Sequence, residues 1–393
     1  MMGTLSDGTW LNAARARAVA LASLAVTIGL VAWLFLTAHG SLDAHGRPLG
    51  TDFSEVYAAG QMALHGDAAK VWDWPSHFAV QQALHGSTSV ELYGWHYPPP
   101  FLLLAAILAT LPYVPALIAW QAATLLPLTI AAQRFLGRRD GWLFVLGAPV
   151  TLICLTHGHN GFLTALLLGG GLLLLERRPL IAGLLLGCLI YKPQFVLILP
   201  PLLLVTRNWR AILGALGSSM LLVALTLALW GWPVWQAFFD SLPLTRHIVV
   251  EQGQAGWFKI MSPFAAMRGW GAGLAAAYAV QAVFSLGAIG ATLWLALRRR
   301  PALRNAAATA AALIATPYVL DYDFVVLLAG IGFLFKDGEE HGWRPWERTL
   351  LAFAWIAPLF ARTLALWTTI PLGAMSALVV LAVALLRASP SRR

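Results

Sequence analysis

The sequence has few of the charged residues that normally cover a soluble protein. Asp, Glu, Lys and Arg make up 11% of its 393 residues, and 59% of the residues are hydrophobic. A soluble domain carries roughly 25% charged residues, so this composition argues against one. Residues 211–239 and 269–297 contain no charged side chain. Each run exceeds the roughly 20 residues with which a helix crosses a bilayer, and in lipid such a run must be helical. The chain is therefore predicted to be an integral membrane protein.

Cysteine is also scarce, which argues against a disulfide framework or a cysteine metal site. The two cysteines, Cys154 and Cys188, both lie in hydrophobic segments and are read as small apolar residues. There are no repeats of solenoid period and no low-complexity tracts. Gly169–Gly171 follow no strand and precede no Lys-Ser/Thr pair, so a phosphate-binding loop is disfavoured. Together with Gly183 and Gly187, they are typical of closely packed membrane helices.

Basic residues outnumber acidic ones by 26 to 17, but they form short clusters between apolar runs. This pattern is typical of orientation signals in membrane proteins and not of a nucleic-acid surface. Seven clusters hold 19 of the 26 basic residues: Arg15/Arg17, Arg134/Arg138/Arg139, Arg177/Arg178, Arg207/Arg210, Arg298–Arg300 with Arg304, Lys336/Arg344/Arg348, and Arg387/Arg392/Arg393. Placing all seven on the cytoplasmic side leaves seven basic and ten acidic residues outside.

About twelve crossings follow from this sidedness, with both termini inside. Segment 97–133 is assigned one net crossing, with a short, proline-broken helix over 97–113. Segment 19–38 follows two arginines and favours a retained anchor over a cleaved signal. The outward crossings are 19–38, 142–156, 180–191, 211–230, 305–318 and 349–366, and the inward ones are part of 97–133, then 160–175, 194–206, 272–297, 323–335 and 370–386. The prediction is a single all-α polytopic domain, residues 1–393, in the cell membrane.

The unusual polar residues then collect on the outer face. The first outer loop, 39–96, carries six acids, and a second long loop, 231–271, is rich in aromatic residues. Loops of this length are often functional. Turns at 156–161, 191–194 and 316–323 face the same side. Charges at membrane depth need partners or a wet cavity, and this requirement applies to Lys192, Asp321, Asp323 and Arg362. Acids and bases converging here suit an anionic lipid-linked substrate and a hydroxyl acceptor.

Each of these elements has a structural alternative. The tryptophans of 230–270 fit a membrane-interface belt as well as sugar stacking. His157 and His159 are more typical of a turn than of a metal site, because no third ligand lies nearby. Lys192 could extend to the interface, and Asp323 could cap a helix.

Segment 51–60, Thr-Asp-Phe-Ser-Glu-Val-Tyr-Ala-Ala-Gly, followed by Leu64-His65-Gly66, resembles glycosyltransferase family 87. This family is the polyprenyl-phosphate-mannose-dependent, mannosyltransferase-like group of the C-type superfamily. Further matches occur in order along residues 19–335: Tyr97-Pro98-Pro99-Pro100-Phe101, Gly158-His159-Asn160-Gly161, Gly183 and Gly187 leading to Tyr191-Lys192-Pro193-Gln194, and Tyr322-Asp323. The motifs are individually weak, but their order and spacing together are fairly specific.

The resemblance implies a C-type architecture and an enzyme that takes sugar from a lipid-phosphate carrier on the outer face. Asp52 occupies the position of the family's general base. Two positions depart from the family pattern: His159 stands where Gln is more frequent, and Asp321 stands near a position that is His in mannosyl-transferring members. The sugar, mannose or another hexose, and the lipid or envelope-glycan acceptor are therefore left open.

The chemistry of sugar transfer assigns further roles to the outer-face residues. A carboxylate takes the proton of the attacking hydroxyl, and one such base in a direct displacement predicts inversion. Cations stabilise the phosphate leaving group, for which the candidates are Lys192, His159, Arg246, Lys259 and Arg362. Candidates for acceptor, sugar or auxiliary contacts are Glu55, Tyr57, Asn160, Gln194, Trp257, Asp321, Tyr322 and Asp323. No cofactor is expected, although Asp52, Glu55, Asp321 and Asp323 offer oxygen ligands for a divalent metal.

Two other functional classes remain open on sequence grounds. A transporter or flippase of a lipid-linked sugar would favour matched halves with ionisable groups near the bilayer midplane. The sequence shows no internal repeat, and its polar residues gather at one face. A non-catalytic envelope-assembly protein is the third possibility. Transfer of label from a polyprenyl-phosphate sugar by purified protein discriminates among the three.

Overall fold

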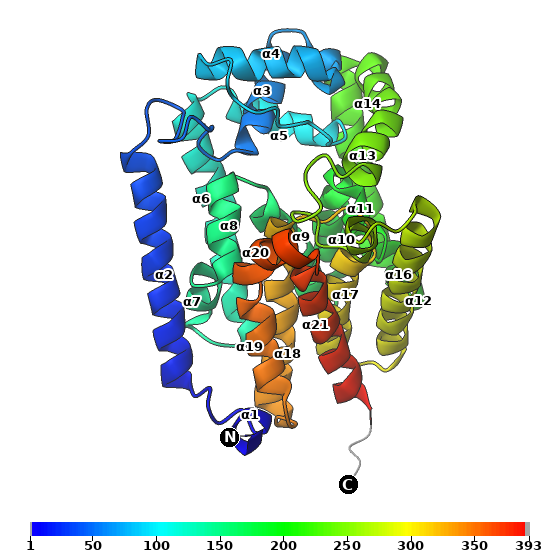
Figure 1. The fold of residues 1–393 in the computed structure, drawn as a ribbon. Coiled ribbons are helices and arrows are strands. Elements are labelled where there is room, and N and C mark those ends of the chain that lie inside the picture. Colours follow the sequence, from blue (N-terminus) through cyan, green and yellow to red (C-terminus); the bar gives the residue numbers. More distant parts are fainter. Residues whose placement is uncertain (1, 390–393) are drawn as a thin grey trace.

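The computed structural model of this chain describes residues 2–389. All regular secondary structure in these residues is helical. Isolated β-bridges occur only in loops, and one of them joins Ile260 to Leu320. Figure 1 shows most helices running between two ends of an elongated bundle, with α1 (Met2–Ser6) and the last residues of α21 (Leu372–Ala388) at its lower end. The all-helical fold predicted from the long uncharged runs is confirmed.

Four helices are long and apolar enough to cross a membrane: α2 (Ala13–Leu36), α6 (Tyr113–Leu136), α13 (Trp209–Trp230) and α16 (Leu274–Leu297). A fifth span is possible if α19 (Glu347–Ile356) and α20 (Pro358–Thr368), bent by 71° at their junction, count as one. The chain is thus a helical membrane protein by length and composition. The predicted number of about twelve crossings is not confirmed, because most remaining apolar helices are shorter than a bilayer requires.

The long helices expose apolar side chains, as membrane-facing helices do. Ile28 on α2 is 60% exposed, Met220 on α13 is 68% exposed and Leu286 on α16 is 71% exposed. A soluble protein rarely exposes apolar surface on this scale, whereas in a bilayer the lipid covers it. From segment 97–133 the structure forms the short α5 (Pro100–Leu108) and the long α6, and of these two only α6 qualifies as a span.

The remaining bundle helices are short because prolines and glycines interrupt them. α8, α10, α11, α17 and α20 each begin at a proline, which lacks the N–H that would continue a preceding helix. In chain order these helices are α1 (Met2–Ser6), α7 (Gly141–Leu146), α8 (Pro149–His157), α9 (Gly161–Leu174), α10 (Pro179–Gly187), η2 (Cys188–Tyr191), α11 (Pro193–Val196), α12 (Leu199–Val205), α17 (Pro301–Ile314), η4 (Asp321–Val326), α18 (Leu327–His341) and α21 (Leu372–Ala388).

Helix α17 is at the centre of this bundle. Every residue from Leu303 to Ile314 is buried, and α17 packs against α16, α18 and α21. On another side of the bundle, α10 lies directly against α13. A Cβ at Gly183 would come within 2.0 Å of the Ala211 carbonyl oxygen, and one at Gly214 within 2.3 Å of the Leu180 oxygen. The small residues therefore permit close helix contact here, as predicted for Gly183.

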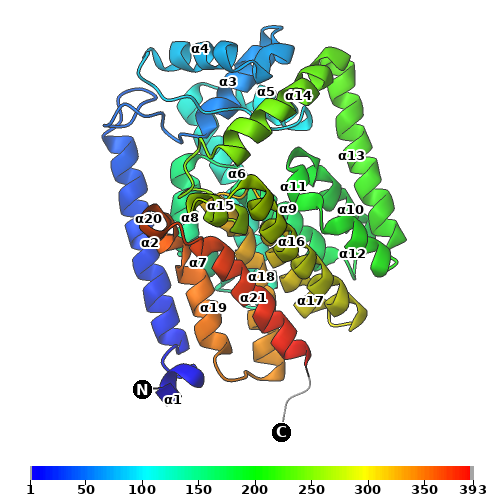
Figure 2. The ribbon, with the colours of Figure 1, turned by 45° about the vertical axis from the view of Figure 1, so that its right-hand side comes forward.

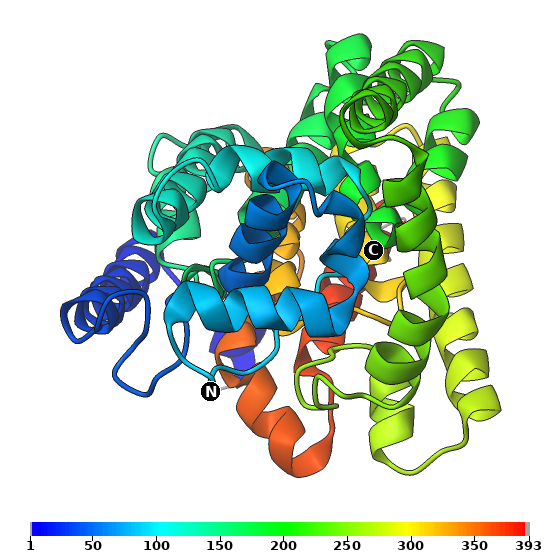
Figure 3. The ribbon, with the colours of Figure 1, turned by 90° about the horizontal axis from the view of Figure 1, so that it is seen from above.

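The two long outer segments form a cap at the end opposite the termini. The first contains α3 (Phe53–Leu64), η1 (Ala68–Trp72) and α4 (Trp74–His85), and the second contains α14 (Trp232–Thr245), the π-helical turn η3 (Arg246–Glu251) and α15 (Pro263–Gly269). The two segments contact each other through Trp72 and Phe238, whose ring centroids are 6.0 Å apart. Figure 2 shows α14 descending from the top of α13 toward the middle of the bundle, and Figure 3 shows the cap from above.

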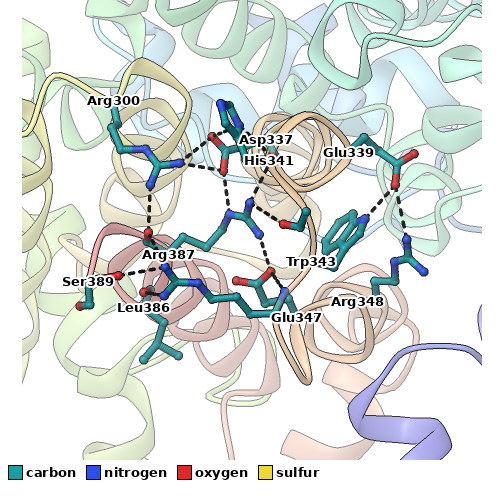
Figure 4. Close-up of polar contacts among 12 residues, drawn as sticks. Arg300, Asp337, Glu339, His341, Trp343, Glu347, Arg348, Leu386, Arg387 and Ser389 are labelled. Carbon is teal, nitrogen blue, oxygen red and sulfur yellow. Dashed lines mark hydrogen bonds and ion pairs between the residues drawn. The ribbon is translucent and has the colours of Figure 1, made fainter. Parts of the chain in front are cut away.

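Basic residues of several predicted clusters lie at the other end, near the start of α2, the end of α18 and the end of α21. Arg17 pairs with Asp140 at 2.8 Å, and Arg304 pairs with Glu176 at 2.7 Å. The inner ion cluster consists of Arg300, Asp337, Glu347 and Arg387, all of which are labelled in Figure 4. It ties α21 to α18 and α19 and to the residue that precedes α17. Arg392 and Arg393 lie outside the described residues.

Candidate functional site

Asp52 immediately precedes α3, and its carboxylate has few hydrogen-bond partners. Its backbone N–H donates to the His157 carbonyl at 3.0 Å, which fixes this turn against the end of α8. Although Asp52 occupies the N-cap position, its side chain makes no capping hydrogen bond. One carboxylate oxygen accepts a long hydrogen bond, 3.4 Å, from the Thr51 hydroxyl. The lone pairs of Asp52 are therefore largely free for a substrate, as a general base requires.

Glu55 lies one helical turn after Asp52, so the two carboxyl groups share a face of α3. Glu55 is 8% exposed, and neither of its carboxyl oxygens has a hydrogen-bond partner among residues 2–389. Burial raises the pKa of Glu55 well above its usual range, and the negative charge of Asp52 raises it further. The Lys192 ammonium acts in the opposite direction.

Lys192 and Asp323 form a buried ion pair. The Lys192 Nζ lies 2.6 Å from a carboxylate oxygen of Asp323, and both residues are less than 5% exposed. The other Asp323 oxygen accepts from the Leu320 N–H at 3.0 Å, so Asp323 also caps η4. Lys192 is therefore not extended to the membrane interface. A lysine ammonium has three donors, and Asp323 occupies one of them.

Arg362 and Asp321 form a second pair next to the first. Two guanidinium nitrogens of Arg362 donate to the two oxygens of Asp321 at 2.7 and 3.0 Å. A third contact, at 3.2 Å, joins Arg362 to the His157 Nε2. Asp321 is 2% exposed, whereas the Arg362 side chain is 35% exposed. The Nε and Nη2 atoms of Arg362 are thus held by these contacts, whereas its Nη1 makes no hydrogen bond within residues 2–389.

Aromatic side chains contact one another close to these pairs. The Tyr97 hydroxyl lies 3.2 Å from the His159 Nε2, and the His159 ring stacks on Tyr322 with a centroid separation of 3.6 Å. Both polar atoms of the buried Asn160 side chain, and the His159 Nδ1, lack a hydrogen-bond partner in the described part of the chain. Buried polar atoms of this kind are uncommon, and they mark the turn between α8 and α9 as specialised.

These residues meet because the short helices end at one level. Helix α8 and the turn η2 end here, α9, α11 and η4 begin here, and α20 contacts both α8 and η4. A Cβ at Gly161 would approach the Tyr322 carbonyl oxygen to 2.9 Å, so only glycine fits without displacement. The site cluster is defined as Asp52, Glu55, Tyr97, His159, Lys192, Asp321, Tyr322, Asp323 and Arg362.

Several predicted site residues lie outside the site cluster. Arg246 pairs with Glu251 at the surface, with 72% of its side chain exposed. Lys259 lies over the Phe258 ring, and Trp257 contacts the guanidinium of Arg268. The buried Tyr57 donates its hydroxyl to the Leu111 carbonyl at 2.8 Å.

Gln194 lies in α11, two residues beyond Lys192, and no hydrogen bond of its side chain occurs within residues 2–389. No group of three or more His, Cys, Asp and Glu side chains in the described residues is arranged to hold a metal ion.

Sequence reasoning did not assign three residues that the structure places in or beside the site cluster. Tyr97 stands just before three consecutive prolines, and this motif was the available signal. His157 was considered only as a turn residue or a metal ligand, yet it contacts Arg362. Tyr318 belongs to the predicted outer turn at 316–323, but nothing in the sequence distinguishes its hydroxyl from that of any other interfacial tyrosine.

Comparison with known families decides the identity. The profile described as Glycosyltransferase family 87 matches residues 95–320, more than half of the chain. The chain belongs to glycosyltransferase family 87. It is therefore a membrane glycosyltransferase, which transfers sugar from a donor to an acceptor. The matched range of this family 87 enzyme includes Tyr97, His159 and Lys192, whereas Asp52 and Glu55 precede it. No curated protein and no solved structure matches the chain.

Proposed function

We propose that this enzyme transfers a hexose, mannose being the first candidate, from a polyprenyl-phosphate donor to a hydroxyl of a lipid or envelope-glycan acceptor. The observation that carries the proposal is the pairing of a free carboxylate with neighbouring cations. Asp52 has no cation partner among residues 2–389, and Lys192 and Arg362 lie in the same site cluster. Asp52 is suited to accept the proton of the acceptor hydroxyl, and Lys192 and Arg362 are suited to bind a phosphate.

The transfer is a single displacement at the anomeric carbon. Asp52 accepts the proton of the acceptor hydroxyl while the acceptor oxygen bonds to that carbon. The bond from the anomeric carbon to the phosphate oxygen breaks, and its electron pair leaves with the phosphate. General base catalysis of this kind contributes roughly 10²–10⁴-fold. Attack from the face opposite the leaving group inverts the anomeric configuration.

The phosphate develops negative charge as it leaves, and cations stabilise that charge. The unused donors of Lys192 and the Nη1 of Arg362 are suited to this role, because each cation is already fixed by an aspartate. Such preorganised donors need no reorientation during the reaction. Tyr322, stacked on His159, supplies an aromatic surface for the sugar ring. Asn160 supplies an amide with no other partner in the described residues.

The proposal includes a location for the site, the outer face of the cell membrane. Basic residues near the start of α2, the end of α18 and the end of α21 lie at the end of the bundle opposite the cap, and positive residues favour the cytoplasmic side. Cysteine labelling tests this arrangement: positions 52 and 259 are expected to react from outside, and position 177 only after permeabilisation. Labelling of position 177 and not of position 52 in intact cells would reverse the orientation.

Transfer by purified protein tests the function. Radiolabelled polyprenyl-phosphate mannose, and then other hexose donors, are incubated with extracted membrane lipids and glycans. The expected product is a labelled acceptor with inverted configuration, formed by the native enzyme and not by Asp52→Asn. Movement of intact donor across a vesicle, without any transfer, would instead support the transporter alternative.

A further inference from the structure

Glu55 differs from every other buried acid in the described chain. The six others, Asp43, Glu251, Asp321, Asp323, Asp337 and Glu347, each pair with an arginine or lysine within 3.2 Å. Glu55 pairs with none, and no described residue donates a hydrogen bond to its carboxyl oxygens. The Glu55 residue is only 8% exposed, and a carboxylate that loses most of its water without gaining a partner is costly to ionise, so such a group takes up a proton instead.

The groups that face Glu55 do not supply the missing charge. On its own helix the neighbour is Asp52, a second acid. Lys192, next to α11, is already balanced by Asp323 at 2.6 Å. From α4, His77 contacts the Glu55 backbone oxygen at 3.2 Å, and burial lowers the pKa of His77 to about 4.

The remaining neighbours that interact electrostatically with Glu55 are the phenols of Tyr97 and Tyr318. Two carboxyl groups therefore share one cation that is already neutralised, and only one of them can ionise without large cost. Asp52 is less buried than Glu55, so of the two carboxyl groups Glu55 is the one that keeps its proton.

We propose that Glu55 acts as a neutral carboxylic acid beside the ionised Asp52, and that its O–H donates to a hydroxyl oxygen of the sugar or acceptor bound there. This role rests on the proposed function and extends it. Glu55 keeps its proton throughout the transfer, while the acceptor proton passes to Asp52. A buried donor left without its acceptor is penalised, so Glu55 selects substrates that carry that hydroxyl.

The pH profile of kcat/KM tests the contact with substrate. As the pH rises through the Glu55 pKa, this group loses its proton, can no longer donate, and repels the charge on Asp52. The rate of the native enzyme is therefore expected to fall on the alkaline side. Glu55→Gln keeps a neutral donor of similar shape, so it should retain activity at neutral pH and lose the alkaline fall. Glu55→Ala should lower kcat/KM roughly 3–10-fold at neutral pH.

A matched control and a second readout separate this proposal from the function itself. Glu91 is an exposed acid in the same outer segment, and Glu91→Gln should keep the native pH profile. The infrared spectrum of the native protein at neutral pH, minus that of Glu55→Gln, should contain a band of a protonated carboxyl group. This measurement does not require that the sugar donor be known.

Absence of this band, or its persistence in Glu55→Gln, would overturn the neutral carboxyl. An unchanged alkaline fall in Glu55→Gln would overturn the substrate contact. Failure of every polyprenyl-phosphate donor would remove the proposed function, and the substrate contact with it, while the infrared band would still decide the protonation of Glu55.

Discussion

The two ends of the molecule bury acids and bases in different ways. In the inner ion cluster, Arg387 lies between Asp337 and Glu347, is 4% exposed, and also donates to the backbone carbonyls of Asp337 and Gly342. Arg300 adds a further contact to Asp337 at 3.2 Å. In the site cluster, two acid–base pairs are equally well made, yet two more carboxyl groups stand beside them without a cation.

The difference separates charges that hold the fold from charges that are available for chemistry. Removing a charge from water is costly, so a buried ion needs partners. At the inner end these partners come from four different segments, and the cluster joins α21 to the bundle. At the site, Asp52 and Glu55 lack such partners, so a substrate or a proton must supply what the protein does not. We infer that the first arrangement holds the fold and that the second serves the proposed chemistry.

The largest effect on activity is expected from Asp52→Asn. Asn occupies an N-cap about as well as Asp, so the variant should fold, but it cannot accept the proton of the attacking hydroxyl. The transfer rate should fall by at least ~10²-fold. Initial rates at saturating donor measure this, and Asp67→Asn, which removes an exposed acid of the same outer segment, should retain the native rate. Near-normal transfer by folded Asp52→Asn would pass the role of base to another carboxylate.

Arg387→Ala tests whether the inner ion cluster stabilises the fold without affecting catalysis. It leaves Asp337 and Glu347 buried without their main cation, which costs about 3–5 kcal/mol of stability. Thermal unfolding in detergent should show a large decrease, whereas kcat of the protein that remains folded should be nearly native.

Arg348→Ala is the matched control for Arg387→Ala, because the Arg348 pair with Glu339 is partly exposed and 3.7 Å long. A loss of kcat in stable Arg387→Ala protein would contradict the separation of the two ends.

Lys192 is expected to serve both purposes, because its ion pair stabilises the fold and its free donors are available to bind phosphate. Lys192→Ala alone leaves Asp323 unpaired and should both destabilise the protein and weaken donor use. The double variant Lys192→Met/Asp323→Asn removes both charges, so it should recover much of the stability. The donor KM of the double variant should still be at least roughly tenfold higher, because a charged hydrogen bond to phosphate is missing. Recovery of normal donor kinetics would make the pair purely structural.

The smallest effect is expected from Arg246→Ala, although this residue was a candidate for phosphate binding on sequence grounds. Its side chain is 72% exposed and its partner is Glu251, so the pair is screened by solvent. Donor KM should change by less than about fivefold. A change comparable with that of the Lys192 double variant would bring the second outer segment into the donor site.

The sequence predicted the membrane class and the clustering of basic residues well, because both depend on composition along the chain. Uncharged runs of more than 20 residues indicate helices wherever they lie, and α13 and α16 follow directly from two of them. The number of crossings was harder to predict. Prolines and glycines divide the apolar runs into helices of 4–17 residues, and hydropathy alone does not distinguish a short span from a helix buried by its neighbours.

The residues of the site were partly predictable for the same reason. Asp52, Lys192, Asp321 and Arg362 stand out as charges beside apolar segments, and each occurs in the site cluster. Their partners were not predictable. Lys192 and Asp323 are 131 residues apart in the chain, and Arg362 and Asp321 are 41 apart. Such contacts depend on which helix ends meet, and no local sequence pattern encodes that.

By itself, the sequence determined that this chain is a helical membrane protein, which residues carry unusual charges, and that it resembles glycosyltransferase family 87. Only the tertiary structure decided which of those charges neutralise one another. It pairs Lys192 with Asp323 and Arg362 with Asp321, and it leaves Asp52 and Glu55 side by side on one turn of α3. The physical reason is that the energy of a charge depends on its burial and on its nearest partners, and folding alone brings those partners together.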